Sequence, residues 1–564
     1  MFLAATGFTQ QLNPLNSLLG STLVALLPLA LLLVLLAVMR VTAWLAVIIG
    51  AVVTIIMAIT IWDSAAGPTF QAWGIGAATG IWSIDWIVFW GVVIYNVLVE
   101  TGAFAHFRHW LVTQATADVR VQAILMAWAL GALLEGLVGF GYPWAVIAPI
   151  LVGLGVTEID AIRVAAIGNN APVSYGALGA PIIALATVTN VPLLDLSASV
   201  GRIVAILALL PPWILIYLVT GRRGLRGIWP LPIVASLSYI LGQFPTSQWL
   251  GPYLPDIIGA LVSFGALLLL LRFWRPAETL GYGGVPLAAG AVPADTEPAA
   301  PGAAGPGTAA TGADVAATRQ RGRVQEALPA FLAFGILIVV VVAATGPWSH
   351  LGDYTFVKPG VDAVSSLPSH KPVSVTFKFA PAVAGTWILL SLLVIVAALR
   401  VGAAQFMAAL KRSFSQTWGA LLVAPIVFGL ATVFNYSGMA STLAYGFSRV
   451  GTWFILLAPL LGWIGVALSG SNTSTNALFG GFQYAVGGLL RMPLLLLPSL
   501  NSAGAEVGKP VAPQTTSVGV STSNYVRREG EVIRHNFGWT LVILGYLILI
   551  GVFYYYVLPD AMRP

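Results

Sequence analysis

Cysteine is absent from the 564-residue chain, which excludes disulfides, cysteine-ligated zinc sites and iron–sulfur clusters. The phosphate-binding pattern GxxxxGKS or GxxxxGKT is absent as well, and this argues against ATP-driven transport by the chain itself. Neither HExxH nor a GxSxG in a suitable context occurs, which argues against an intramembrane protease or hydrolase. We therefore expect no cofactor, no metal site and no enzymatic activity.

Charged residues are scarce too. They make up 8% of the chain and hydrophobic residues 58%, whereas about a quarter of a soluble domain is charged. The composition indicates a polytopic protein of the lipid bilayer, and the net charge of +6, spread over short loops, predicts no nucleic-acid partner. All histidines are expected in polar loops, which argues against a buried histidine proton relay. They are His106, His109, His350, His370 and His535.

Long apolar runs are the main feature that is present. A spanning helix needs about 20 mostly apolar residues. Suitable runs lie near residues 20–39, 42–62, 84–101, 200–220, 253–273, 327–345, 382–399, 417–435 and 538–557, with a weaker one near 228–244. Together with two interrupted regions, these runs predict an all-α polytopic membrane protein of about 12 spanning helices plus two hairpins.

The interrupted apolar regions, roughly 121–190 and 451–520, are broken repeatedly by Gly, Pro, Asn and Ser. Each has a polar residue before a glycine and then, at nearly the same spacing, an asparagine. These are Glu135, Gly136 and Asn169 in the first region, and Ser469, Gly470 and Asn501 in the second. We expect a re-entrant hairpin in each, although charge does not distinguish it from a spanning one, and a helix that breaks at the Asn. This predicts an inverted repeat with broken helices; the alternative is that Gly and Pro are simply common in membrane helices.

The remaining organisation follows from charge and composition. Residues 276–318 are rich in Ala, Gly and Pro, which predicts a flexible linker. Cytoplasmic loops are enriched in Lys and Arg, and the basic loops place this linker inside. The predicted parts are an N-terminal transmembrane half (1–275), a flexible cytoplasmic linker (276–325) and a C-terminal transmembrane half (326–564). The last contains an extracytoplasmic insertion (347–381), in which the alternating VSVTFKF predicts a β-hairpin.

Several motifs resemble those of the bacterial L-lactate permease family, the lactate/glycolate:proton symporters. They are LLEGLVGFGYP, NNAPVSYGALGAPI, GPYLPDIIGALVS, NYSGMASTLA, GSNTSTNALF and GKPVAPQ, in family order from about residue 80 to 530. The resemblance implies proton-coupled uptake of short 2-hydroxymonocarboxylates (L-lactate, D-lactate and glycolate) at the bacterial inner membrane. Two positions depart from the family pattern: Asn472 stands where an Asp is usual, and Glu506 stands where the family tends to be uncharged.

Glu135 is the first candidate for proton coupling, because it lies in an apolar segment beside a glycine-rich break. Burial disfavours its charged form and would make protonation usable. The alternative is a carboxylate that caps neighbouring backbone N–H groups. Glu506 and Asp256 are the next candidates, although Asp256 follows Pro255 near the start of a helix, where an N-cap role is the simpler interpretation.

Lys509 is the candidate cation for the substrate carboxylate, or a counter-ion for Glu506 or Glu135, because a membrane-buried lysine is costly unless paired. The alternative is that it extends to the interface. The other candidate substrate-binding residues are polar groups at the breaks, which equally well could satisfy a broken backbone, and glycines that permit close approach. They are Asn169, Ser471, Asn472, Thr473, Asn501, Gln514, Gly136 and Gly139.

Three other functions are compatible with parts of this pattern. The Ser, Thr and Asn groups at the breaks could ligate Na⁺, which would make the protein a Na⁺-coupled carboxylate transporter of the same architecture. A channel or an intramembrane enzyme would not need inverted broken helices. The sequence leaves the oligomeric state open.

Overall fold

The computed structural model describes residues 8–39, 41–114, 117–139, 141–287, 324–367, 372–521 and 523–564. In this part of the chain nine helical runs are long and apolar enough to cross a membrane, or eleven if each of two bent helix pairs is one span. The predicted all-α polytopic membrane class is therefore confirmed. The expected number of about 12 spans and the inverted repeat are not confirmed.

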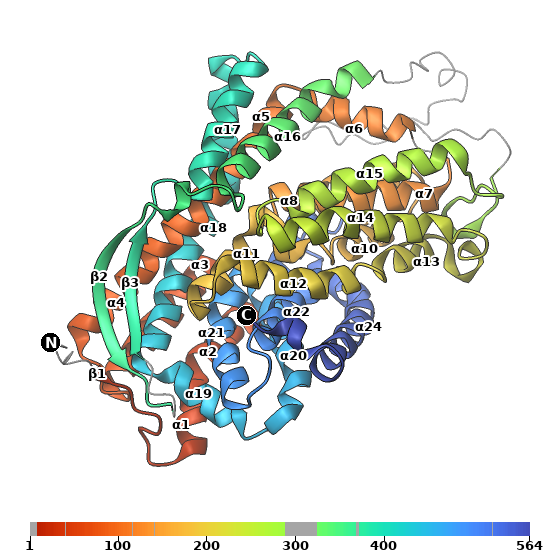
Figure 1. Cartoon of the computed structure of the whole chain (residues 1–564). Coiled ribbons are helices and arrows are strands. Elements are labelled where there is room, and N and C mark those ends of the chain that lie inside the picture. Colours follow the sequence, from red (N-terminus) through yellow and green to blue (C-terminus); the bar gives the residue numbers. More distant parts are fainter. Residues whose placement is uncertain are drawn as a thin grey trace.

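A group of apolar helices packs around the long helix α18, at the left of Figure 1. With 35 residues, α18 is about 52 Å long at the usual rise per residue. The backbone of α4 approaches α18 closely, because a Cβ at Gly80 would lie 2.9 Å from Pro425 Cα. The helices are α1 (Leu18–Ala25), α2 (Leu27–Leu33), α3 (Ala43–Thr60), α4 (Ala66–Gly80), α5 (Trp86–Glu100) and α18 (Ala403–Ser437), with π-helical turns over Val34–Val38 and Ile81–Asp85.

A second group projects at the top of Figure 1, where α16 (Val324–Thr345) packs against α6 (Ala103–Gln114) and α17 (Ala384–Ala398). The Phe107 ring of α6 lies 5.3 Å from the Phe331 ring and 5.9 Å from the Phe334 ring of α16. Two histidines that were expected in loops, His106 and His109, lie in α6. The loop prediction is also wrong for His535, which lies in α24 (Glu529–Tyr556).

A small sheet covers one side of the first helix group (Figure 1). Its strands are β1 (Phe8–Thr9), β2 (Phe356–Val364) and β3 (Pro372–Phe379), in the order β1-β2-β3. The β2 and β3 pair is antiparallel, with Phe356 opposite Phe379, and β1 pairs with β2 in parallel. The predicted β-hairpin is confirmed, while its pairing with a strand near the N-terminus was not foreseen.

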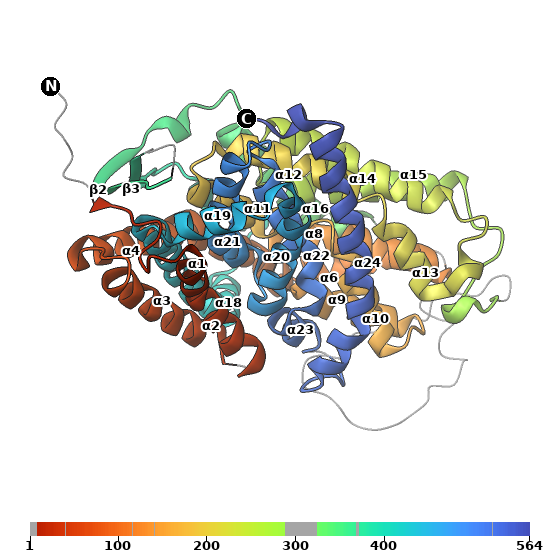
Figure 2. The same cartoon turned by 90° about the horizontal axis from the view of Figure 1, so that it is seen from below.

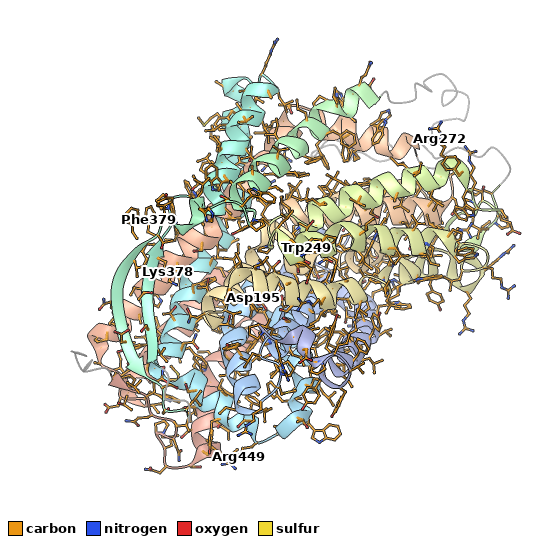
Figure 3. All side chains as sticks on the ribbon, in the orientation of Figure 1. Asp195, Trp249, Arg272, Lys378, Phe379 and Arg449 are labelled. Carbon is orange, nitrogen blue, oxygen red and sulfur yellow. The ribbon has the colours of Figure 1, made fainter. Side chains whose placement is uncertain are left out.

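A third group of helices runs across the right of Figure 1. Here α14 and α15 lie side by side. Gly242 of α14 allows this close approach, because a Cβ at Gly242 would lie 2.7 Å from the Cα of Gly259 in α15. Figure 3 shows Arg272 at the end of α15 that is far from the sheet residues Lys378 and Phe379. The helices are α12 (Leu193–Leu207), α13 (Pro211–Gly224), α14 (Pro230–Trp249) and α15 (Pro255–Phe273).

The interrupted regions occupy the centre of the molecule, as the view from below shows (Figure 2). The first hairpin has one arm over Val119–Leu137, all of it buried, and a second arm in α9. The second hairpin consists of α20 and α21. The elements are α7 (Val119–Ala123), a π-helix (Ile124–Leu130), α8 (Gly131–Leu137), α9 (Tyr142–Gly153), α10 (Glu158–Gly168), α11 (Gly176–Thr189), α19 (Met439–Ser448), α20 (Phe454–Ser469), α21 (Asn472–Leu489), α22 (Leu496–Gly508) and α23 (Pro513–Gly519).

One of the two expected helix breaks is where the sequence placed it. Asn169 ends α10, and the chain bends by 67° before α11. The prediction for Asn501 is wrong, because this residue lies inside α22 and the break follows at Lys509. A 3-10 turn over Lys509–Val511 follows α22, and the chain becomes extended at Ala512, because proline disfavours a helical conformation in the residue before it and Pro513 comes next.

The predicted linker over 276–325 falls mostly outside the described residues, since 288–323 are not described. Its first part, 276–287, packs against the helical body. The Leu280 N–H donates to Asp118 Oδ2 (3.0 Å), and Arg120 donates to the Glu278 carbonyl (2.7 Å). The boundary between the first half and any free linker therefore lies after these contacts.

Candidate functional site

Two hairpin tips and one short helix meet at the centre. The first tip has Gly139 and Gly141 at φ of 68° and 77°, and the second has Gly470 at 72°, a region that side chains disfavour. Helix α23 lies against both tips. Thr515 contacts Gly141 and donates from Oγ1 to the Gly470 carbonyl (3.1 Å), while Gln514 contacts Gly470. The glycines thus allow three backbone segments to converge.

The backbone is strained in the first residues of α11. Ala177, Leu178 and Gly179 follow one another at φ of 47°, 57° and 80°. For the two residues with side chains this left-handed conformation costs about 1–2 kcal/mol each. Such strain persists where the surroundings fix the backbone, and it is concentrated at functional sites.

Glu135 of α8 forms an ion pair with Lys509, which directly follows α22. The two side chains are only 2% and 5% exposed, so Lys509 does not extend to an interface. The second carboxylate oxygen, Glu135 Oε2, accepts a hydrogen bond of 2.8 Å from Asn169 Nδ2 at the end of α10. Gly176 permits this arrangement, because a Cβ there would lie 2.6 Å from Glu135 Oε1. Three predicted residues from three separate segments therefore lie together.

The ion pair makes the centre electrically neutral, and a buried charge is tolerated only when it is paired and hydrogen-bonded. Several hydrogen-bonding atoms next to this ion pair have no partner within the described part of the chain. Asn169 Oδ1 and both amide atoms of the fully buried Asn170 have no hydrogen-bond partner within the described part of the chain. An unsatisfied buried polar group costs about 1–3 kcal/mol. The arrangement is therefore suited to a small polar ligand that would supply these partners.

A second buried cluster surrounds Glu506 in the last turn of α22. Glu506 Oε2 accepts a hydrogen bond of 2.5 Å from Ser174 Oγ, and Ser174 Oγ lies 3.2 Å from Ser502 Oγ. Ser502 Oγ also accepts from Asn476 Nδ2 at 3.0 Å. Asn501 belongs to this cluster, since it donates to Asn476 Oδ1 at 2.9 Å. These contacts join α22 to α21 and to the break before α11.

Asp256 is a third buried acidic residue, and it lies in the first turn of α15. The N-cap interpretation is wrong, because the N-cap of α15 is Leu254 and Asp256 lies inside the first turn. Its Oδ1 accepts a hydrogen bond of 2.9 Å from the Tyr239 hydroxyl, and its Oδ2 has no partner among the described residues. Gly136 permits the contact between α8 and α15, since a Cβ there would lie 2.8 Å from Asp256 Cβ.

The remaining predicted residues differ in burial and in their hydrogen-bond partners. Ser471 is the N-cap of α21, where its side chain accepts from the Ser474 N–H (3.2 Å), so it satisfies the backbone. Asn472 is buried and donates to the Ser502 carbonyl (3.2 Å), leaving its Oδ1 without a partner in the described chain. Thr473 is only half-buried.

Five buried residues of these clusters were not predicted: Asn170, Ser174, Tyr239, Gln483 and Ser502. Each is a polar residue in an apolar segment, and this signal was visible. Their partners were not, because Ser174 and Ser502 are 328 residues apart in the chain.

Comparison with known proteins shows which family the chain resembles. Residues 21–558 match the sequence model of the family described as L-lactate permease. The chain belongs to the L-lactate permease family. It is therefore a multi-pass transporter of the bacterial inner membrane.

Two curated relatives of this family member match over nearly their full length. The chain is 32% identical to glycolate permease GlcA of Escherichia coli (strain K12), with 98% of this chain and 99% of that protein covered. It is 31% identical to L-lactate permease of Bacillus subtilis (strain 168), with 95% and 96% covered.

Two solved structures match with lower similarity. The Alcanivorax borkumensis YdaH transporter is 14% identical, with a TM-score of 0.43 over 87% of this chain and 88% of that chain. Neisseria gonorrhoeae MtrF is 12% identical, with a TM-score of 0.45 over 88% and 86%.

Proposed function

We propose that this transporter carries short 2-hydroxymonocarboxylates, L-lactate, D-lactate and glycolate, together with a proton. The substrate class is supported by the names of the relatives, L-lactate permease and glycolate permease. The coupling is supported by one observation, the buried ion pair of Glu135 and Lys509. A buried cation that already holds a carboxylate has the chemistry to hold a different one.

In the proposed step, the substrate carboxylate replaces the Glu135 carboxylate as the partner of the Lys509 ammonium. The displaced Glu135 has then lost its counter-charge in a low-dielectric surrounding, so it takes up one proton. The site is neutral before the step, with Glu135 ionised and Lys509 charged. It is neutral after it, with the substrate ionised and Glu135 protonated. One anion and one proton thus enter together. Because the loaded site is neutral, it can switch from facing one side of the membrane to facing the other at low electrostatic cost.

The 2-hydroxyl group is recognised beside the carboxylate. Asn169 Oδ1 and the amide of Asn170 are buried without partners among the described residues, and they offer one donor group and two acceptors to a hydroxyl. A carboxylate without a 2-hydroxyl would leave these groups unsatisfied, and discrimination against such analogues follows.

The test is uptake of radiolabelled L-lactate and glycolate by purified protein in liposomes, driven by a pH gradient without Na⁺. The natural chain should concentrate both substrates. Glu135→Gln, which mimics the protonated form and frees Lys509, should still bind lactate and exchange it in counterflow. The ratio of lactate concentration inside the liposomes to that outside should fall to about 1, because no proton is bound and released in the cycle.

The matched control is Glu278→Gln, which removes one charge from a side chain that is 69% exposed and should leave uptake unchanged. If Glu135→Gln still concentrates lactate with the usual pH dependence, Glu135 is structural and the proton travels with Glu506, Asp256 or the substrate. A strict need for a Na⁺ gradient would contradict proton coupling. Saturable, gradient-driven accumulation would also exclude a channel and an intramembrane enzyme.

A further inference from the structure

The turn that carries Lys509 lies between two helices of the C-terminal half, α20 and α24 (Figure 2). It is a 3-10 turn that begins at Lys509 and joins α22 to α23. On one side α20 approaches closely, because a Cβ at Gly508 would lie 2.6 Å from the Trp463 carbonyl oxygen. On the other side Asn536 of α24 donates from Nδ2 to the Pro510 carbonyl oxygen (2.9 Å). A side chain from another element therefore holds the backbone beside the buried lysine.

This hydrogen bond satisfies a carbonyl group that the turn itself leaves over. The last carbonyl groups of a helix have no partner inside that helix. Here the Lys509 carbonyl accepts from the Ala512 N–H (3.1 Å), and the buried Pro510 carbonyl accepts from Asn536. A buried carbonyl without a partner is costly. The bond from α24 thus favours this path of the turn over others.

Asn536 itself is a costly residue at its position. Its side chain is fully buried, and its Oδ1 has no hydrogen-bond partner among the described residues. A leucine of similar size would avoid the cost of an unsatisfied buried oxygen. What the amide supplies, and an apolar side chain could not, is the donor to Pro510.

The preceding residue of α24 contacts the other element that holds the site together. His535 Nε2 lies 2.9 Å from Asp160 Oδ1 of α10. The same helix α10 ends at Asn169, which donates to the Glu135 carboxylate. Two neighbouring residues of α24 therefore contact both partners of this carboxylate through their backbone segments, α10 and the turn that begins at Lys509. Helix α24 is a common support for the two.

We propose that Asn536 is a positioning residue for Lys509. By holding the Pro510 carbonyl, it fixes the point from which the Lys509 ammonium group reaches Glu135, and with it the strength with which a substrate carboxylate is held. The statement about the substrate rests on the function proposed above, whereas the statement about the ion pair does not.

The first test is binding of radiolabelled L-lactate to the purified full chain in detergent, by equilibrium dialysis at fixed pH and ionic strength. Asn536→Leu, which has a similar size and no donor, should raise Kd about three- to tenfold, the net effect of one hydrogen bond. The number of sites per folded chain should stay the same, whereas a merely structural role would lower that number and leave Kd unchanged.

The matched control is Thr540→Val, one turn later in α24. Thr540 is also fully buried, but its hydroxyl donates within its own helix, to the Phe537 carbonyl (2.9 Å). This substitution therefore removes a buried polar group from α24 without touching the turn, and Kd should not change.

Thermal unfolding tests the positioning without substrate. The loss of melting temperature caused by Lys509→Ala should be smaller in the Asn536→Leu background than in the natural chain, because the ion pair is already weakened there. In the Thr540→Val background the loss should keep its full size.

An unchanged Kd in Asn536→Leu would overturn the proposal, as would an equal rise in Thr540→Val or additive losses of melting temperature. If Asn536→Leu does not fold, Asn536→Ala, which leaves room for a water molecule, is measured instead and the same outcomes apply. Failure of the proposed function is distinguishable. Accumulation by Glu135→Gln with the usual pH dependence would contradict the proton step, and a natural chain that binds no lactate would contradict the substrate class. In both cases the thermal measurements still decide the role of Asn536.

Discussion

At the scale of single residues, Lys509 joins the two halves of the chain. It follows α22 in the C-terminal half, and its ammonium group contacts Glu135, which is 374 residues earlier in the sequence. The α-helical path ends at Gly508, and Lys509 begins a 3-10 turn (Lys509–Val511) that places its ammonium group at the level of the first hairpin. The position of one cation therefore depends on a local backbone break and on a long-range contact.

We predict that Lys509→Ala abolishes accumulation. Removing one partner of a buried ion pair leaves the other charged, which lowers the free energy of unfolding by about 3–5 kcal/mol. Lys509→Arg should fail as well, because the planar guanidinium does not replace a compact ammonium beside Glu135. Uptake in liposomes and thermal unfolding measure the two effects.

The double variant Glu135→Gln with Lys509→Met separates stability from transport. It removes both charges, so it should unfold at a higher temperature than Lys509→Ala while accumulation stays absent. Unchanged substrate affinity and rate in Lys509→Ala would remove this residue from the site.

At the scale of elements, the hairpin tips set the shape of the site. Gly141 has a φ of 77°, and a Cβ there would lie 2.8 Å from the Thr515 carbonyl oxygen of α23. A side chain at this position would therefore be strained in its own backbone and would push α23 away.

Gly141→Ala should lower the free energy of unfolding by about 2 kcal/mol or more and reduce uptake. The control is Gly265→Ala in α15, where an added Cβ meets nothing within 4 Å. That substitution should be neutral or stabilise by up to about 1 kcal/mol. Equal melting temperatures for the two variants would show that the tip has no such constraint.

The elements also show what the sequence could predict. Glycines in apolar segments predicted both hairpins, and Asn169 marked a true break. Asn501 misled because its side chain is satisfied inside the helix, where it bonds Asn476 and Gln483. Whether a polar residue ends a helix or continues it depends on partners from other segments, and local sequence does not contain them. For the same reason the sequence offered both Glu506 and Glu135 as partners of Lys509 and could not choose between them, whereas the structure pairs Lys509 with Glu135.

At the scale of the whole molecule, the structure is closed around its centre. As whole residues, Glu135, Lys509 and Asn169 are at most 4% exposed, so a substrate that binds them, as proposed above, would reach them only after neighbouring elements move. The α10 helix, which carries Asn169, is also tied at its other end. Asp160 of α10 accepts a hydrogen bond from Thr157 (2.8 Å) and lies 2.9 Å from His535 Nε2 of α24. Opening must therefore change contacts at both ends of α10 or move α24 with it.

The connection between the halves should matter much less than these contacts. Residues 288–323 are rich in Ala, Gly and Pro, a composition that predicts a flexible linker. Deleting 296–313 should therefore leave uptake and melting temperature unchanged, because a flexible linker only limits how far its ends can separate.

The contrasting deletion removes 276–287, which bonds Asp118 and Arg120 of the first hairpin arm. Arg120 and Asp118 are buried at 3% and 1% exposure, and without this segment part of their hydrogen bonding is lost. We expect this deletion to lower the melting temperature and the uptake rate, with membrane insertion intact. Loss of transport after deletion of 296–313 would show that the linker does more than connect the halves, and full activity without 276–287 would place the boundary of the first half earlier in the chain.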